Sequence, residues 1–389
     1  MPKPKVRAVT AFIRIEVNRW EQQFAHTLET LHAARGNFES RGYAVESVRI
    51  CTQPFPQWLA DVPRAEALAI LRRMDDLAVA APFELGIGPA MRGNDDDNPA
   101  MAELLGEALE TARLLQANLL IAGNDGPHPR AMRAAADLVL HAAAHSPRSQ
   151  GPFNFTTLAC VRPCSPFFPG SWHDGSGGEF AVGMESAGVV EEVFRRTAGH
   201  AETARRELAS ALTTHARAAS DAARDIERTS GWRYLGFDPT PAPLHDVSIA
   251  KAIEAFTGSP FGAPGTLAAA ALITSVVRAI PVQQVGYSGL MLPVLEDAGL
   301  ARRWSEGGLS LDALLAYSAV CATGLDTIPL PGNVTREQLE RIYGDVAALA
   351  VRWGKPLAAR LMPVTGKGPG DMTDFSDPFL TNARLQPLT

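Results

Sequence analysis

The sequence predicts an α/β fold with about ten strands in a largely parallel sheet. Strand-like runs alternate with helix-like runs along the chain, and helices supply the crossovers that parallel neighbours need. Hydrophobic residues make up 46% of the 389 positions, which is ample for a large core. No repeat, low-complexity linker or charge run marks a domain boundary. We therefore expect one domain over residues 1–389, built either as a closed barrel or as a large wound sheet.

The first part of the chain alternates regularly between strands and helices. Val6–Val17 is rich in β-branched residues and alternates between apolar and polar, which is typical of a strand. Trp20–Arg41 has helical spacing, with Phe24, Leu28 and Leu31 on one face. In order, the predicted elements are strand 6–17, helix 20–41, strand 44–51, helix 64–80, strand 83–87, helix 101–115, strand 117–122, helix 129–145 and strand 153–161.

The second part adds a long helical region. Ala187–Arg228 is alanine-rich with dispersed charges, and it predicts either one long helix or two antiparallel ones, as an excursion from the sheet. Ser310 and Thr335 are candidate N-caps, because their hydroxyl groups can accept bonds from a helix's first N–H groups. The predicted elements are strand 179–184, helical region 187–228, strand 234–237, helices 247–256 and 266–280, strand 285–294, helix 310–323, strand 325–330, helix 335–353 and strand 356–363.

Composition excludes several classes of function. The formal net charge is −6 and 20% of residues are charged, so no basic footprint for nucleic acid or anionic membrane is expected. No uncharged apolar stretch reaches the ~20 residues of a membrane span, and no signal peptide is expected.

The four cysteines predict reduced thiols in a cytoplasmic protein. Cys160 and Cys164 have zinc-like spacing, but a second ligand pair is missing, so two thiols are favoured. The Asp95–Asp97 run predicts a solvated loop.

Residues 163–179 carry the best candidates for catalysis. Three prolines and two phenylalanines form a stiff apolar arm that ends in His173 and Asp174. An imidazole titrates near neutral pH and can serve as acid or base. Glu185 follows the next strand, where carboxylates of α/β folds commonly line a ligand crevice. The alternatives are a turn in which the His–Asp pair makes local hydrogen bonds, and a solvated strand end for Glu185.

Further polar residues lie at the ends of apolar segments. Carboxylates in such places are candidate ligands of a divalent cation such as Ca²⁺, Mg²⁺ or Mn²⁺, because these ions prefer oxygen. The candidates are Asp238, Asp326 and Asp371. Hydroxyl and cationic groups are candidates for substrate binding; these are Ser288, Arg360 and Lys367. The alternatives are an Asp that caps a turn and, for Gly286–Gly289, a structural bulge.

Several long motifs resemble a known family. They are Val48–Pro54, Cys164–Pro169, Phe261–Thr266, Gly286–Asp297, Tyr317–Pro329 and Pro363–Asp371. Together they resemble the uncharacterised bacterial and archaeal family called domain of unknown function 711, or uncharacterised protein family 0210. The resemblance implies a barrel of about ten strands with surrounding helices, similar to pyruvate formate-lyase and anaerobic ribonucleotide reductase, and it implies no activity. Those enzymes carry a glycyl radical in an Arg-Val-x-Gly-Tyr-like loop. Here the loop reads Gly366–Asp371, so no glycyl radical is expected.

These observations predict an enzyme of hydrolase or lyase type acting on a small polar or carboxylated substrate inside the barrel. His173 would be the acid or base, assisted by a divalent cation, with no nucleotide cofactor. The expected partners are a small-molecule substrate and further copies of the chain, with neither nucleic acid nor membrane. The alternative is a non-catalytic small-molecule or metal sensor. Both hypotheses require the predicted side chains to converge at one mouth of the barrel.

Overall fold

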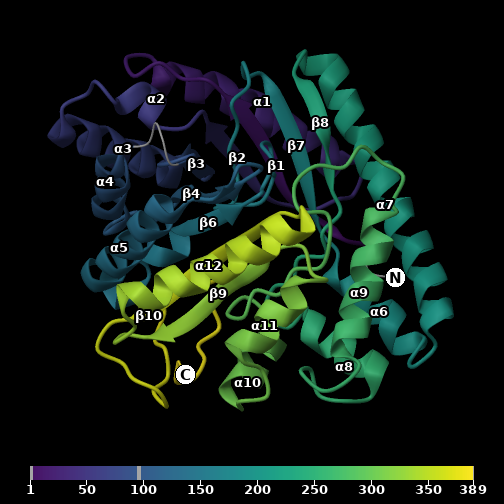
Figure 1. Cartoon of the computed structure of the whole chain (residues 1–389). Helices are drawn as coiled ribbons and strands as arrows, with labels where there is room; N and C mark the ends of the chain where they lie inside the picture. The colour runs from purple at the N-terminus through teal and green to yellow at the C-terminus, as the bar shows by residue number, and fades with distance from the viewer. Residues whose placement is uncertain (1–2, 94–97, 389) are drawn as a thin grey trace.

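The computed structural model describes residues 3–93 and 98–388, so the predicted loop at Asp95–Asp97 lies outside the described residues. It is an α/β structure with a ten-stranded mixed sheet (Figure 1). The strands are β1 (Lys5–Ile13), β2 (Val45–Thr52), β3 (Glu84–Pro89), β4 (Leu115–Gly123), β5 (Gly126–Pro127), β6 (Phe155–Ala159), β7 (Glu179–Glu185), β8 (Arg233–Asp238), β9 (Gly324–Pro331) and β10 (Leu357–Val364). Their order is β8-β7-β1-β2-β3-β4-β6-β10-β9, and β5 pairs with β4.

The sheet is less parallel than the sequence predicts. Strands β1, β2, β3, β4 and β6 are parallel neighbours, as expected for strands joined by helical crossovers. However, β7 runs antiparallel to β1, and β10 runs antiparallel to β6. The first reversal has a local cause, because residues 160–178 join β6 to β7 without any helix.

The predicted strand at 285–294 is irregular. Gly286 (φ 70°) and Ser288 (φ 48°) have left-handed backbone conformations that interrupt regular pairing. The segment nevertheless bonds to both edge strands. Phe237 of β8 donates its N–H to the Gln283 carbonyl at 2.8 Å. Val294 donates to the carbonyl of Asp326 in β9 at 2.9 Å. Residues 283–294 therefore lie beside both edges of the sheet.

Helices cover the outer face of the sheet. They are α1 (Trp20–Ser40), α2 (Pro56–Leu59), α3 (Arg64–Ala80), α4 (Pro99–Leu109), α5 (Pro129–His145), α6 (Ala187–Arg196), α7 (Ala201–Ser230), α8 (Ile249–Thr257), α9 (Thr266–Arg278), α10 (Ala298–Ser305), α11 (Leu311–Ser318) and α12 (Arg336–Trp353). In Figure 1, α3, α4 and α5 lie to one side of the strands, and α6 to α9 lie to the other. Both predicted caps are confirmed: Ser310 accepts from Ala313, and Thr335 forms a reciprocal capping box with Gln338.

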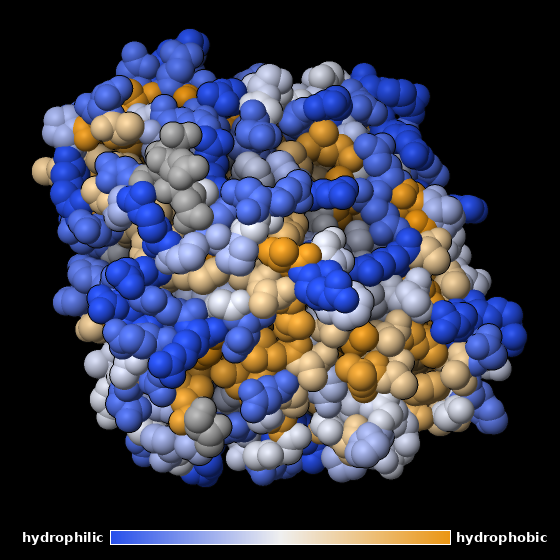
Figure 2. Space-filling model, in the orientation of Figure 1, coloured by the Kyte–Doolittle hydropathy of each residue, from blue (hydrophilic) through white to orange (hydrophobic). Residues whose placement is uncertain are grey.

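The helical region predicted at 187–228 forms two helices, α6 and α7. The longer helix, α7, packs against α1, α9 and β8, because its alanine-rich face is buried. The face of the molecule in Figure 2 is mostly hydrophilic, with apolar patches between charged side chains. Among the described residues, no helix combines the length and the apolar character needed to cross a bilayer.

Candidate active site

The apolar arm lies in the segment 160–178, which joins β6 to β7 and folds back against the strands. Its tip is held by buried polar side chains of three strands. The carbonyl of Pro166 accepts from the Thr10 hydroxyl at 3.0 Å and from the Arg49 guanidinium at 3.4 Å. The Asn118 amide donates to the carbonyls of Pro169 at 2.8 Å and Ser171 at 2.7 Å. These bonds satisfy backbone groups that would otherwise be buried without partners.

Glycines in two strands make room for the tip. A Cβ atom at Gly86 of β3 would lie 2.9 Å from the Phe168 ring, and one at Gly183 of β7 would lie 3.3 Å from the Phe167 ring. Both rings pack where the strands carry no side chain. The arm tip therefore packs directly against β3 and β7, and its stiffness serves packing.

A group of buried and half-buried charged residues lies beside the arm tip. We call it the interior charge cluster; its members are Arg7, Glu46, Arg49, Glu84, Glu185, Glu296, Asp326 and Arg360. Its three arginines come from β1, β2 and β10, and their side chains are at most 10% exposed. Buried guanidinium groups require partners, because desolvation of an unpaired charge costs several kcal/mol.

Glu296 is the centre of the ion pairs. Its carboxylate binds Arg7 at 3.4 Å and also pairs with Arg360. Arg7 additionally contacts Glu46 and Glu185, each at 3.2 Å. Burial raises the pKa of Glu296 above its ordinary value, and the two arginines only partly oppose this. A carboxyl group of this kind can exchange a proton nearer to neutral pH than an exposed one.

Arg49 is the arginine with the fewest acidic partners. It pairs with Glu84 at 3.1 Å and lies 5.2 Å from the centre of the Phe168 ring. Burial lowers the pKa of Arg49, and the attraction of Glu84 does not compensate. By contrast, the attraction of nearby carboxylates outweighs burial at Arg7 and Arg360 and raises their pKa values. Arg49 is therefore the cluster's least neutralised positive charge.

Two spaces that share five lining residues border the cluster. An outer pocket of about 400 Å³ is lined by all three arginines, Glu296 and Phe168. An inner cavity of about 40 Å³ has the same five side chains in its wall, together with the arm tip, Tyr287 and Asp326. The outer pocket has the volume of a small-molecule site. It lies at the end of the sheet where β2, β3 and β4 begin, because Glu46, Glu84 and Gln116 also line it.

Three of the nine residues predicted from the sequence meet in this cluster: Glu185, Asp326 and Arg360. Asp326 pairs with the Arg360 Nε at 2.8 Å, and Glu185 reaches Lys5 and Arg7. Asp326 and Arg360 line the inner cavity. Their predicted classes differ, since Glu185 is predicted as catalytic, Asp326 as a metal ligand and Arg360 as a substrate ligand.

The predicted convergence of His173 with Glu185 is wrong. His173 is fully buried and donates from Nε2 to the carbonyl of Ile13 at 2.7 Å, at the end of β1. Glu185 pairs with Lys5 at the start of β1, because β7 runs antiparallel. The eight residue steps along β1 from Lys5 to Ile13, at about 3.3 Å each, place Glu185 and His173 roughly 25 Å apart. Burial lowers the pKa of His173, so it is neutral at pH 7, and the adjacent Asp174 is exposed.

The other predicted residues serve local structure. The Asp238 carboxylate accepts from Thr240, Tyr287 and Ser288, and so holds the Gly286–Gly289 turn against β8. The Ser288 hydroxyl donates to the carbonyl of Val285. Lys367 and Asp371 lie in a surface loop. Lys367 donates to the Met372 carbonyl and pairs with Asp374, and Asp371 accepts from Gly368. Asp238, Asp326 and Asp371 are therefore not brought together.

Sequence reasoning missed Arg7, Arg49 and Glu296. The available signal was a charge in an otherwise apolar strand, such as Arg7 in Val6–Phe12 and Arg49 in Val48–Cys51. It also missed a surface group on two helices, Glu110, His141 and His145. In the described part of the chain, this is the group of three potential metal ligands whose atoms lie within 4.8 Å of one another.

Comparison with known proteins places the chain in an uncharacterised family. A family model described as "Uncharacterised ACR (DUF711)" matches residues 1–376, and the chain belongs to that family. The UPF0210 protein of Pyrobaculum aerophilum is 32% identical over 375 residues, which cover 92% of this chain and 82% of the relative. The UPF0210 protein of Neisseria meningitidis serogroup B is 27% identical over 86% of this chain and 77% of the relative.

Among solved structures, the anaerobic ribonucleotide reductase of Thermotoga maritima aligns with 91% of this chain and 75% of its own. The TM-score is 0.41 and the identity 9%, values too low to carry an argument about activity.

Proposed function

We propose that this protein is an enzyme that binds a small carboxylated substrate in the outer pocket and acts on it by acid–base chemistry. The observation that supports this most is the meeting of three buried arginines from three strands at one pocket of about 400 Å³. A guanidinium group binds a carboxylate through two parallel hydrogen bonds. Arg49 is the proposed substrate ligand, because it has the fewest acidic partners of the three.

Glu296 is the proposed acid or base. It lines both spaces, and its pKa is raised by burial. Proton transfer is most efficient when the pKa of the catalytic group lies close to the working pH. Arg7 and Arg360 hold its carboxylate from two sides, so its position is fixed. The arm tip closes the inner end, and Phe168 would exclude water from a substrate bound to Arg49.

The proposal includes a closed barrel. The segment 283–294 bonds to β8 at one end and to β9 at the other, and these are the two edges of the sheet. A closed sheet has no free edge and encloses its inward side chains. Closure would account for the burial of five charged residues of the interior charge cluster and the partial burial of the other three.

The proposal is tested with mono- and dicarboxylates and their methyl esters as matched uncharged probes. Carboxylates that bind are expected to raise the melting temperature, while their esters do not, and Arg49→Met is expected to abolish the shift. Arg336→Met, a change at an exposed arginine of α12, is the control and should leave the shift intact. Equal stabilisation of the wild type by acid and ester would overturn the assignment of Arg49.

A second experiment distinguishes an enzyme from the alternative, a non-catalytic sensor. Each stabilising carboxylate is incubated with the protein and followed by NMR. Conversion that depends on Glu296 supports the enzyme, whereas stabilisation without conversion supports the sensor. The divalent cation, the small-molecule partner, the cytoplasmic location and the homo-oligomer remain parts of the proposal. Metal analysis and sedimentation of the purified protein test the cation and the oligomer.

A further inference from the structure

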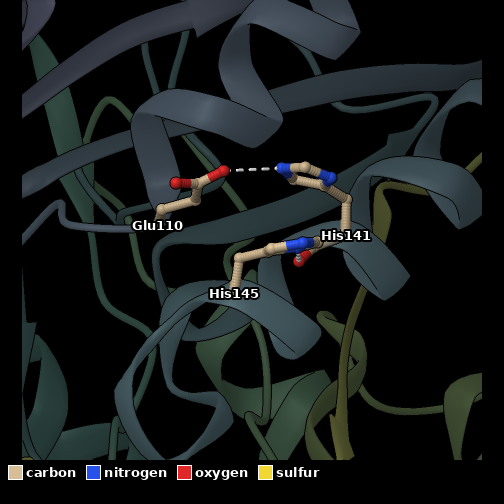
Figure 3. A group of neighbouring side chains, drawn as sticks. All are labelled: Glu110, His141 and His145. Atoms are coloured by element: carbon tan, nitrogen blue, oxygen red, sulfur yellow. Dashed lines mark hydrogen bonds and ion pairs between the residues drawn. The ribbon is translucent and has the colours of Figure 1, made fainter.

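We propose that Glu110, His141 and His145 form a surface site for a transition-metal ion, with Zn²⁺ as the best match. The site is independent of the outer pocket and of the proposed function. His141 and His145 are one helical turn apart on α5, and Glu110 is the C-cap of α4 (Figure 3). Two imidazoles and one carboxylate are a common ligand set for zinc, and they leave one coordination position open.

The three side chains are already close together. His141 Nε2 lies 2.8 Å from the Glu110 carboxylate, and the rings of His141 and His145 are stacked with centres 4.2 Å apart. Ligands about 2.1 Å from a tetrahedral zinc ion lie about 3.4 Å apart, so the hydrogen bond must lengthen slightly to admit the ion. The stacked imidazole rings must also turn, so that their in-plane lone pairs point at one position. An ion between them would replace the proton that His141 and Glu110 share.

His145 has the tautomer that a metal ligand binding through Nε2 requires. Its Nδ1 donates to the carbonyl of His141 at 2.8 Å, which assigns the proton to Nδ1. The lone pair is then on Nε2. A hydrogen bond from the second ring nitrogen to a carbonyl is the usual support of a zinc-bound histidine.

Gly106 provides space for His141. It is buried within α4, one turn before Glu110, and a Cβ atom there would lie 3.3 Å from the His141 ring. Glycine inside a helix costs about 1 kcal/mol relative to alanine. The small residue lets the imidazole lie against α4 and reach Glu110.

Two helix ends favour a cation at this position. Glu110 caps the C-terminus of α4, and His145 is the last residue of α5. The final carbonyls of a helix carry partial negative charge, which stabilises a nearby positive ion. A bound ion would tie the ends of the two helices together.

Isothermal titration of metal-free protein with ZnCl₂ at pH 7.5 tests the site. We expect one ion per chain, with affinity at least about tenfold weaker in His141→Ala and in His145→Ala. Affinity should also fall at pH 6, because imidazole must lose its proton to bind. His26→Ala is the matched control, since the exposed His26 side chain pairs with Glu29 and has no histidine one turn away on α1.

Gly106→Ala tests whether zinc binding depends on the position of the His141 ring against α4. The added methyl group should displace the His141 ring and weaken zinc binding while both ligands remain. The proposal is overturned if the wild type binds no zinc at 100-fold excess, or if both histidine variants bind as tightly as His26→Ala.

Discussion

Replacement of Arg360 by methionine tests the account of the interior charge cluster. Arg360 pairs with Glu296 and with Asp326, and all three side chains are at most 14% exposed. Methionine keeps the apolar stem but leaves two buried carboxylates without this partner. Breaking a buried ion pair by removing one partner costs about 3–5 kcal/mol. For 389 residues the unfolding entropy is about 0.8 kcal/mol/K, so the melting temperature should fall by about 4–6 °C.

The assay is thermal unfolding followed by circular dichroism, with two companion variants. Arg336→Met removes an arginine that contacts three carboxylates but is 45% exposed. This change should shift the melting temperature by about 1 °C or less, because exposed ion pairs contribute little to stability. The double variant Arg360→Met/Glu296→Gln removes one uncompensated charge and should regain part of the loss. Equal shifts at Arg360 and Arg336, or no recovery in the double variant, would refute the reasoning.

Three further changes test other parts of the structure. Burial raises the pKa of Asp238 to about 6, so the stabilisation from its protonated form is lost as pH rises. The free energy of unfolding of the wild type, relative to that of Asp238→Asn, should therefore fall between about pH 4 and 6. A difference that grows with pH contradicts this. Gly86→Ala should cost about 1–3 kcal/mol by overpacking Phe168, and Phe168→Leu in the same chain should restore part of it, as urea unfolding can show. Thr335→Ala removes the capping box and should lower the free energy of unfolding, measured with urea, by about 1 kcal/mol. No change would mean that water replaces the cap.

The sequence predicted the local elements well, because they depend on periodicity and caps within a few residues. The strand at Val6–Val17 is present as β1, and the helices begin near Ser310 and Thr335 as their hydroxyl caps indicate. The region predicted as helical at 187–228 contains the two helices α6 and α7, so the two-helix alternative is confirmed. The predicted family is likewise confirmed, since its motifs are contiguous in the chain.

The site depended on strand direction and register, which the sequence does not contain. His173 and Glu185 are only twelve positions apart, but an antiparallel β7 carries them to opposite ends of β1. Arg7, Arg49 and Arg360 are far apart in sequence, and they line one cavity because tertiary packing brings β1, β2 and β10 to it. A local pattern fixes which segments are strands and helices. The tertiary structure decided which charges face one another, because the sheet order places the three arginines and a loop outside the sheet brings Glu296 to them.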